Sequence, residues 1–209
     1  MHKVFISYHH KNDQLYKDHL IYLNKLNNIF IDKSVNTGDI SDALPHQSIR
    51  LKIRDEYLRD STVTILLLGT ETKYRKHIDW ELKSSMINGI INKRSGILVI
   101  TLPSIGCNSW LASHPNETNM IYPEYSDWSY INNKSDYEVR YPYMPKRIID
   151  NLISPNVNIS VVPWHKIENN FYNLQFLISA TANSRSSNLY DLSEPMRMRD
   201  YNPTPLYSY

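Results

Sequence analysis

The sequence predicts an α/β fold in which helices cover both faces of an open, parallel, five-stranded sheet. Two observations support this prediction. Short apolar runs alternate along the chain with segments whose apolar residues recur at helical spacing. The runs at 62–69 and 96–102 are β-branched or apolar at almost every position, which is typical of strands buried on both faces. In such folds, ligands bind beyond the carboxyl ends of the strands.

The predicted strands are short runs of apolar and β-branched residues. They occupy 4–8, 29–32, 62–69, 96–102 and 159–164. The first helix is expected to run from Asn12 or Asp13, each of which can cap a helix, to about Asn28. Its predicted apolar stripe comprises Leu15, His19, Tyr22, Leu23 and Leu26.

Three further helices are expected between and after the later strands. One follows a polar loop at 33–45 and has an apolar stripe of Ile49, Ile53 and Tyr57. The next is predicted at 72–93, with a stripe of Ile78, Leu82, Met86 and Ile90. The last is predicted at 167–182.

The domain is expected to span 1–183, with an insertion at 103–157 and a C-terminal tail at 184–209. The insertion is far longer than a usual connection between neighbouring strands, and it contains a candidate short helix at 146–153. It is interpreted as a cap over the site, an oligomer contact or a packed surface excursion, and we favour the last. The tail has no apolar periodicity, so we expect it to wrap on the domain.

Charge and cysteine content restrict the possible functions. The 209 residues contain 23 Lys and Arg against 21 Asp and Glu, so the basic excess that a nucleic-acid-binding protein usually carries is missing. The single cysteine, Cys107, cannot form an internal disulfide or a multi-cysteine zinc site. The N-terminus has no secretory pattern and no apolar run is long enough to span a membrane. We therefore expect a cytoplasmic protein that binds neither nucleic acid nor membrane.

The sequence also lacks several motifs of enzymes and nucleotide-binding proteins. It has no G-x-G-x-x-G, Walker A, G-x-S-x-G or H-E-x-x-H pattern. His9 and His10 are adjacent, but neighbours on a strand point to opposite faces, so we expect no metal site.

The segment from His77 to Ser85 is the strongest candidate for chemistry. It comes early in the helix after the third strand, so we expect it at the carboxyl edge of the sheet. His77, Glu81 and Ser85 share one helix face, whereas Asp79 and Lys83 look like a solvated pair on another. A glutamate facing a cleft could bind sugar hydroxyls and stabilise an oxocarbenium-like centre. From spacing alone, a surface pair between Glu81 and His77 is the more common outcome.

Four segments, in this order, resemble the TIR-like domain family, most closely that of the bacterial Thoeris anti-phage system. Residues 4–9 (VFISYH) are similar to the first strand of the family, and Asp32-Lys33-Ser34 with the loop to Pro45 is similar to its second strand and BB loop. Residues 61–72 resemble the third strand and its turn, and residues 80–85 (WELKSS) resemble the helix that carries a glutamate. The resemblance covers about residues 1–102.

This resemblance implies a flavodoxin-like TIR fold and an activity that consumes NAD⁺ as its substrate, with no separate cofactor. On phage infection, such proteins make a cyclic or conjugated ADP-ribose molecule that activates a separate effector protein. The resemblance also implies self-association through TIR surfaces and a phage-derived trigger.

The resemblance assigns roles to individual residues. Glu81 matches the catalytic glutamate. The substrate-binding residues would be Phe5, Ser7, Tyr8 and His9 in the first loop, Asp32 and Ser34 at the edge of the second strand, and His77. Tyr8 could stack on a ring and Ser7 could donate a hydrogen bond. His77 departs from the aromatic or cysteine residue that many members have there, and Trp80 is expected to pack in the core.

Two other functions remain open at this stage. Many TIR domains are adaptors that only bind other TIR domains, although an adaptor has no chemical need for Glu81. A nucleoside deoxyribosyltransferase would also place a glutamate near a nucleoside, and turnover of NAD⁺ against a nucleoside would separate the two enzymes.

Overall fold

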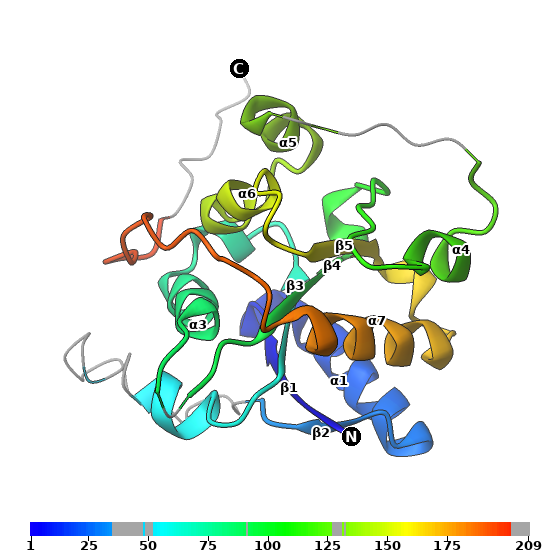
Figure 1. Cartoon of the computed structure of the whole chain (residues 1–209), viewed down its shortest axis with the longest axis horizontal. Helices are drawn as coiled ribbons and strands as arrows, with labels where there is room; N and C mark the ends of the chain where they lie inside the picture. The colour runs from blue at the N-terminus through cyan, green and yellow to red at the C-terminus, as the bar shows by residue number, and fades with distance from the viewer. Residues whose placement is uncertain (35–47, 49–51, 91, 127–130, 132, 202–209) are drawn as a thin grey trace.

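The computed structural model describes residues 1–34, 48, 52–90, 92–126, 131 and 133–201. It confirms the α/β flavodoxin-like TIR fold, with a five-stranded parallel sheet between two layers of helices (Figure 1). The strand order is β2-β1-β3-β4-β5. The strands are β1 (His2–Ser7), β2 (Phe30–Asp32), β3 (Val63–Leu68), β4 (Gly96–Thr101) and β5 (Ile159–Pro163).

The register of β1 against β3 determines where the site forms. Ser7, the last residue of β1, pairs with Leu66, two residues before the end of β3. The carboxyl ends of these parallel strands therefore meet at one edge of the sheet. Strands β3, β4 and β5 are buried at every position because helices cover both of their faces.

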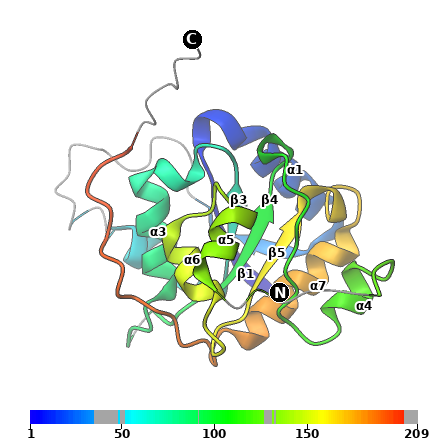
Figure 2. The ribbon, with the colours of Figure 1, turned by 90° about the horizontal axis from the view of Figure 1, so that it is seen from above.

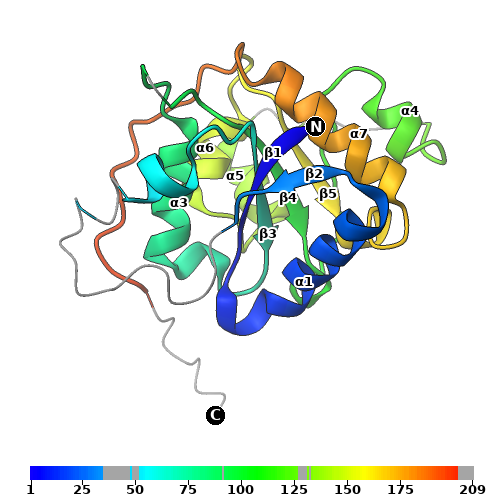
Figure 3. The same cartoon turned by 90° about the horizontal axis from the view of Figure 1, so that it is seen from below.

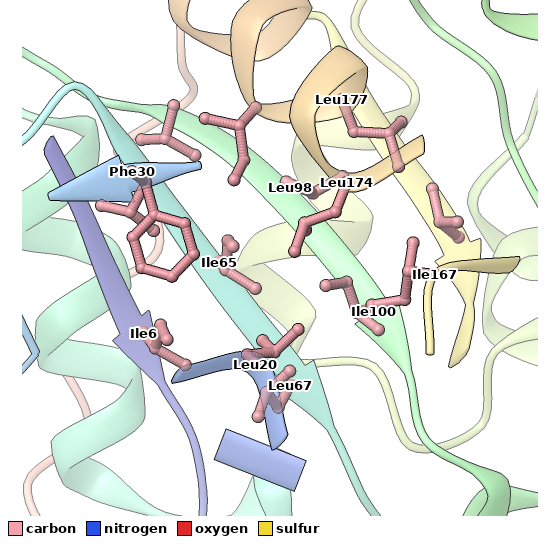
Figure 4. Packing of buried hydrophobic residues seen from close by; sticks show 14 of the residues in the cluster. Ile6, Leu20, Phe30, Ile65, Leu67, Leu98, Ile100, Ile167, Leu174 and Leu177 are labelled. Carbon is pink, nitrogen blue, oxygen red and sulfur yellow. The ribbon is translucent and has the colours of Figure 1, made fainter. Parts of the chain in front are cut away.

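One face of the sheet is covered by α1 (His10–Asn27) and α7 (Phe171–Ser184), which lie side by side in Figure 3. Leu20 of α1 and Leu174 and Leu177 of α7 are fully buried in this layer. Figure 4 shows these leucines beside the apolar side chains of β1, β3 and β4, and all of them belong to one buried cluster.

The apolar stripe predicted for the first helix was wrong at three of its five positions. Leu15, Tyr22 and Leu26 are exposed, with Leu15 at 81% of its full exposure. Leu23 is buried as predicted, and the residues that the prediction missed on this face are Leu20 and Asp13. The first turns of α1 place a carboxylate against the sheet edge, which helical periodicity of apolar residues does not reveal.

The other face is covered by α3 (Lys76–Met86), α5 (Lys134–Arg140) and α6 (Lys146–Leu152), as Figure 2 shows. Side chains from all three helices join one apolar cluster with β3, β4 and β5. Two of these helices belong to the segment between β4 and β5, so part of the insertion forms a layer of the domain. The observed α6 agrees closely with the short helix expected at 146–153.

The helix predicted at 72–93 is shorter than expected. A 3-10 turn, η2 (Thr72–Tyr74), precedes α3, and the Thr72 hydroxyl accepts a hydrogen bond from the backbone N–H of Gly69 at 2.8 Å. After Met86 the backbone becomes extended at Ile87, so the predicted position of Ile90 in the buried stripe was wrong. Ile78, Leu82 and Met86 are buried as predicted. The stripe therefore identified the helix but not its ends.

The remaining elements connect these layers. The described part of the helix predicted around 49–57 contains a π-helical turn, η1 (Ile53–Tyr57), with Ile53 fully buried. Ile49 and residues 35–45 of the predicted loop lie outside the described residues. The insertion also contains η3 (Pro103–Ile105) and α4 (Glu117–Ile121), and η4 (Trp164–Lys166) follows β5. Within the described ranges, no helix combines the length and apolar character that crossing a membrane requires.

The chain after α7 returns across the second helical layer. Residues 191–201, here named the C-terminal strap, run beside α6 and α3 and are drawn in orange to red in Figures 1 and 2. Backbone oxygens of the strap accept hydrogen bonds from side chains of both helices, from Asn151 of α6 and from Lys83 of α3.

Candidate functional site

The candidate site is built around Glu81, in the second turn of α3. Its side chain points at the carboxyl end of β1, where the Ser7 hydroxyl donates a hydrogen bond to Glu81 Oε2 at 2.5 Å. Only 8% of Glu81 is exposed. The alternative of an exposed Glu81 paired with His77 on the surface is therefore wrong, because the glutamate is buried against the strand edge.

Burial determines the acid–base behaviour of this carboxyl. Removal from water disfavours the charged form and raises the pKa of Glu81 to about 7, although the hydrogen bond from Ser7 acts in the opposite direction. Near neutral pH, both protonation states of Glu81 are thus populated. A carboxyl with this pKa can hold or release a proton at physiological pH.

The end of β2 brings two further predicted residues to the same strand. The backbone N–H of Ile6 donates to the Ser34 hydroxyl oxygen at 3.2 Å, so Ser34 lies beside β1. That hydroxyl in turn donates to Asp32 Oδ1 at 2.5 Å, and the backbone N–H of Ser34 donates to the same oxygen at 2.9 Å. Asp32 is exposed at this edge. The two residues form one hydrogen-bonded turn.

Alternation along β1 separates Phe5 and Ser7 from Tyr8. Phe5 is buried with Trp80, directly before the glutamate, which confirms that Trp80 packs in the core. Tyr8 points to the opposite face, into the layer of α1 and α7, and is 3% exposed. Its ring stacks on His10 at 4.4 Å and its hydroxyl donates to Gln14 at 2.8 Å. The structure therefore does not bring Tyr8 to Glu81.

The first half of the chain has a clear relative among known families. Residues 5–105 match the family model described as the Thoeris protein ThsB, TIR-like domain. Residues 5–105 are therefore a TIR-like domain of the ThsB family. The match contains β1, β2, β3, α3 and β4, and so it includes Ser7 and Glu81. No significant match to a curated protein was found.

His9 and His10 follow the carboxyl end of β1, and His77 lies one helical turn before Glu81 on α3. Burial lowers the pKa of His9 and His10, and nearby positive charge lowers both further, from Arg75 for His9 and from His77 for His10. The ring of His77 meets Trp80 edge-on, with ring centres 5.1 Å apart. Within the described residues, no group of three or more His, Cys, Asp or Glu side chains could hold a metal ion.

Sequence reasoning missed the surroundings of Asp79. The predicted solvated pair of Asp79 and Lys83 was wrong. Asp79 instead receives two hydrogen bonds from the guanidinium of Arg147, at 3.0 and 3.2 Å, and Lys83 donates to the backbone oxygen of Glu194. These partners come from the insertion and the strap, beyond the matched TIR-like range, so no local pattern around Asp79 could reveal them.

Two other buried carboxylates also escaped prediction. Asp13 is 2% exposed beside Gly69, and burial raises its pKa to about 6. Glu117 in the insertion is fully buried and accepts a hydrogen bond from the Ser160 hydroxyl at 2.6 Å. Burial raises the pKa of Glu117 to about 7, as it does for Glu81. Glu117 therefore provides a chemically matched control for Glu81.

Proposed function

We propose that this Thoeris TIR protein cleaves NAD⁺ and makes a cyclic or conjugated ADP-ribose messenger on phage infection, which activates a separate effector protein. The observation that carries the proposal is the buried Glu81 carboxyl, held by Ser7 at the carboxyl edge of β1. Ligands of open parallel sheets bind at this edge. Membership of the ThsB TIR-like family supports the same reaction class.

The proposed reaction breaks the bond between C1 of the ribose and the nicotinamide nitrogen. The bonding electron pair leaves with nicotinamide, and positive charge develops on the ribose. The ionised Glu81 would accept hydrogen bonds from ribose hydroxyls and stabilise that charge in a site with little water. An internal nucleophile then gives a cyclic product, another small molecule gives a conjugate, and water gives ADP-ribose.

Predicted residues other than the core residues Phe5 and Tyr8 would surround this carboxyl and bind substrate. Ser7 positions Glu81, and Asp32 with Ser34 offers oxygen acceptors for hydroxyl groups at the neighbouring strand end. His9 and His77 border the same edge, and a mainly neutral His9 avoids placing a further positive charge there. Contact between each of these residues and NAD⁺ is part of the proposal.

A non-catalytic adaptor is the alternative function. An adaptor needs TIR surfaces but has no chemical use for a buried glutamate with a pKa near neutrality. Glu117 has a similar pKa and no proposed function, so the feature that favours the enzyme is the position of Glu81 at the carboxyl edge of β1, where ligands of such sheets bind.

The decisive experiment compares NAD⁺ consumption and product mass in extracts of phage-challenged cells that express wild type, Glu81→Gln or Glu117→Gln. Glutamine nearly preserves the shape of each side chain but removes its charge. Glu117→Gln is the matched control because Glu117 is also buried and bonded to a serine. We expect NAD⁺ loss with wild type and Glu117→Gln but not with Glu81→Gln.

The product mass would identify the messenger. Cleavage by Glu81→Gln at the wild-type rate would remove Glu81 from the proposed mechanism. If NAD⁺ loss is absent from wild type under every challenge, the adaptor becomes the better description.

A further inference from the structure

The C-terminal strap is fixed along α3, on both sides of the glutamate. Asp200 Oδ1 accepts a hydrogen bond from the backbone N–H of Lys76, the first residue of α3, at 2.7 Å. The indole N–H of Trp80 donates to the backbone oxygen of Arg197 at 2.7 Å. Lys83 donates to the backbone oxygen of Glu194 at 2.9 Å. The strap therefore contacts the start of the helix and the residues just before and two after Glu81.

Arg147 of α6 joins the strap to this helix. Its side chain is fully buried, and its guanidinium donates twice to Asp79 of α3. The same guanidinium donates to the backbone oxygens of Glu194 at 3.0 Å and Pro195 at 3.1 Å. The planar fork of an arginine can make these bonds together, whereas a lysine ammonium cannot reproduce the geometry. Asp79 completes the junction by accepting from the backbone N–H of Arg197 at 2.8 Å.

The strap also reaches the strand that carries Ser7. Met196 packs on a small buried cluster that contains Phe5 and Trp80. Phe5 lies two residues before Ser7 on β1, and Trp80 directly precedes Glu81 on α3. The cluster therefore packs beside both residues of the Ser7–Glu81 hydrogen bond, through Phe5 on β1 and Trp80 on α3. A shift of the strap would change how closely α3 approaches β1.

We propose that Arg147 is a positioning residue, which docks the C-terminal strap on α3 and thereby holds Glu81 against Ser7. This inference rests on the proposed function for its catalytic consequence, but the positioning itself can be measured without turnover. It assigns a role to Arg147 of the insertion and to the strap, both of which lie outside the matched TIR-like range. The residue acts through α3 and touches no substrate.

The test uses the full chain with Arg147→Lys, which keeps a positive charge beside Asp79 but removes the fork that binds the strap. The matched control is Arg140→Lys, the same substitution on α5 of the insertion. If Arg147→Lys does not fold, Arg147→Met with Asp79→Leu replaces the buried pair by apolar side chains, an exchange that proteins often tolerate. Asp200→Ala removes only the strap contact at the start of α3.

Three measurements are made on each variant. Hydrogen exchange of the Trp80 indole N–H reports whether the strap is docked. An NMR titration of the Glu81 carboxyl carbon reports its burial and its contact with Ser7. Steady-state kinetics of NAD⁺ cleavage separate kcat from KM.

We expect faster exchange at Trp80 in Arg147→Lys and a Glu81 titration midpoint that moves at least about one pH unit toward acid as the carboxyl gains water. We expect kcat to fall about tenfold or more while KM stays within about threefold. The reason is that the exact position of the Glu81 carboxyl matters for stabilising the transition state and much less for binding the substrate. Arg140→Lys should match wild type in all three measurements.

Two results would overturn the proposal. One is an undocked strap with an unchanged Glu81 midpoint and unchanged kcat. The other is normal protection of the Trp80 indole when Arg147 is replaced. A shifted Glu81 midpoint in a protein whose wild type cleaves no NAD⁺ would support the positioning role and reject the proposed reaction, so the two failures are distinguishable.

Discussion

Glu81 and Glu117 are buried carboxyls with the same kind of partner and different surroundings. Each accepts a hydrogen bond from a serine hydroxyl, and burial raises the pKa of each to about 7. Glu117 also accepts two backbone N–H bonds and is completely buried, whereas 8% of Glu81 is exposed at the strand ends. Chemistry with a ligand requires access, so the proposed reaction is assigned to Glu81 and not to Glu117.

The first residue-scale prediction concerns pH. Cleavage needs the ionised carboxylate, so kcat/KM should rise from about pH 5.5 and level off above about pH 8, with a midpoint near the Glu81 pKa of about 7. A pH-rate profile of NAD⁺ cleavage checks this. A profile that is flat across neutrality would contradict the role of Glu81.

The same pKa predicts how stability depends on pH. The folded pKa of about 7 lies above the ordinary value of 4.5, so the folded state binds the proton more tightly than the unfolded state. This contribution is fully present below about pH 4.5 and is lost as the pH rises through about 7. Its upper limit is about 3 kcal/mol. Urea unfolding at several pH values should show a smaller loss over this window for Glu81→Gln than for wild type.

A third prediction isolates Ser7. Its hydrogen bond lowers the pKa of Glu81, so Ser7→Ala should raise that pKa and move the midpoint of the pH-rate profile to higher pH. Activity at neutral pH should fall several-fold as a smaller share of the carboxyl is ionised. Ser160→Ala, which removes the corresponding bond to Glu117, is the control and should leave the midpoint unchanged.

At the scale of elements, close packing of α7 on β4 depends on one glycine. A Cβ added at Gly96 would lie 2.3 Å from the backbone oxygen of Thr181 on α7. Relief of this clash requires the helix or the strand to move, because the opposing atom belongs to the backbone. The neighbouring strands β3 and β5 restrict that movement.

Gly96→Ala should therefore lower the free energy of unfolding by about 1–3 kcal/mol. Chemical denaturation of the variant and of wild type checks this, provided that the two proteins have the same m-value. Gly106→Asn is the control, since Gly106 has a φ of +62°, which asparagine tolerates, and an added Cβ there meets nothing within 4 Å. Equal stability of Gly96→Ala and wild type would show that α7 adjusts without cost.

Strands and helices could be predicted from the sequence where a local pattern of apolar residues marks them. The apolar runs located all five strands, and the stripe of Ile78, Leu82 and Met86 located α3. The buried face of α1 was not predictable in the same way. Its exposed Leu15 and Leu26 are as apolar as its buried Leu20, and only the sheet decides which of them faces inward.

At the scale of the whole molecule, the ThsB TIR-like domain is enclosed by segments from outside the matched range. The insertion supplies α5 and α6, and the strap crosses α3. If activity also requires TIR self-association, as the family resemblance implies, the isolated protein at low concentration should have low activity. We expect the specific rate of NAD⁺ cleavage to rise with protein concentration in parallel with oligomer formation measured by sedimentation. High turnover by a dilute monomer would contradict this expectation.

The sequence by itself determined the parallel α/β fold and its strands, and it indicated Glu81 as the candidate for chemistry, because alternating apolar runs and the order of short motifs are local properties of the chain. Only the tertiary structure decided that Ser7 binds Glu81, that Tyr8 faces away, and that Arg147 joins Asp79 to the strap. These contacts connect residues separated by 74, 68 and 47 positions along the chain. Such pairs form only when strands and helices pack, and no periodicity within one segment specifies the partner that packing will bring to it.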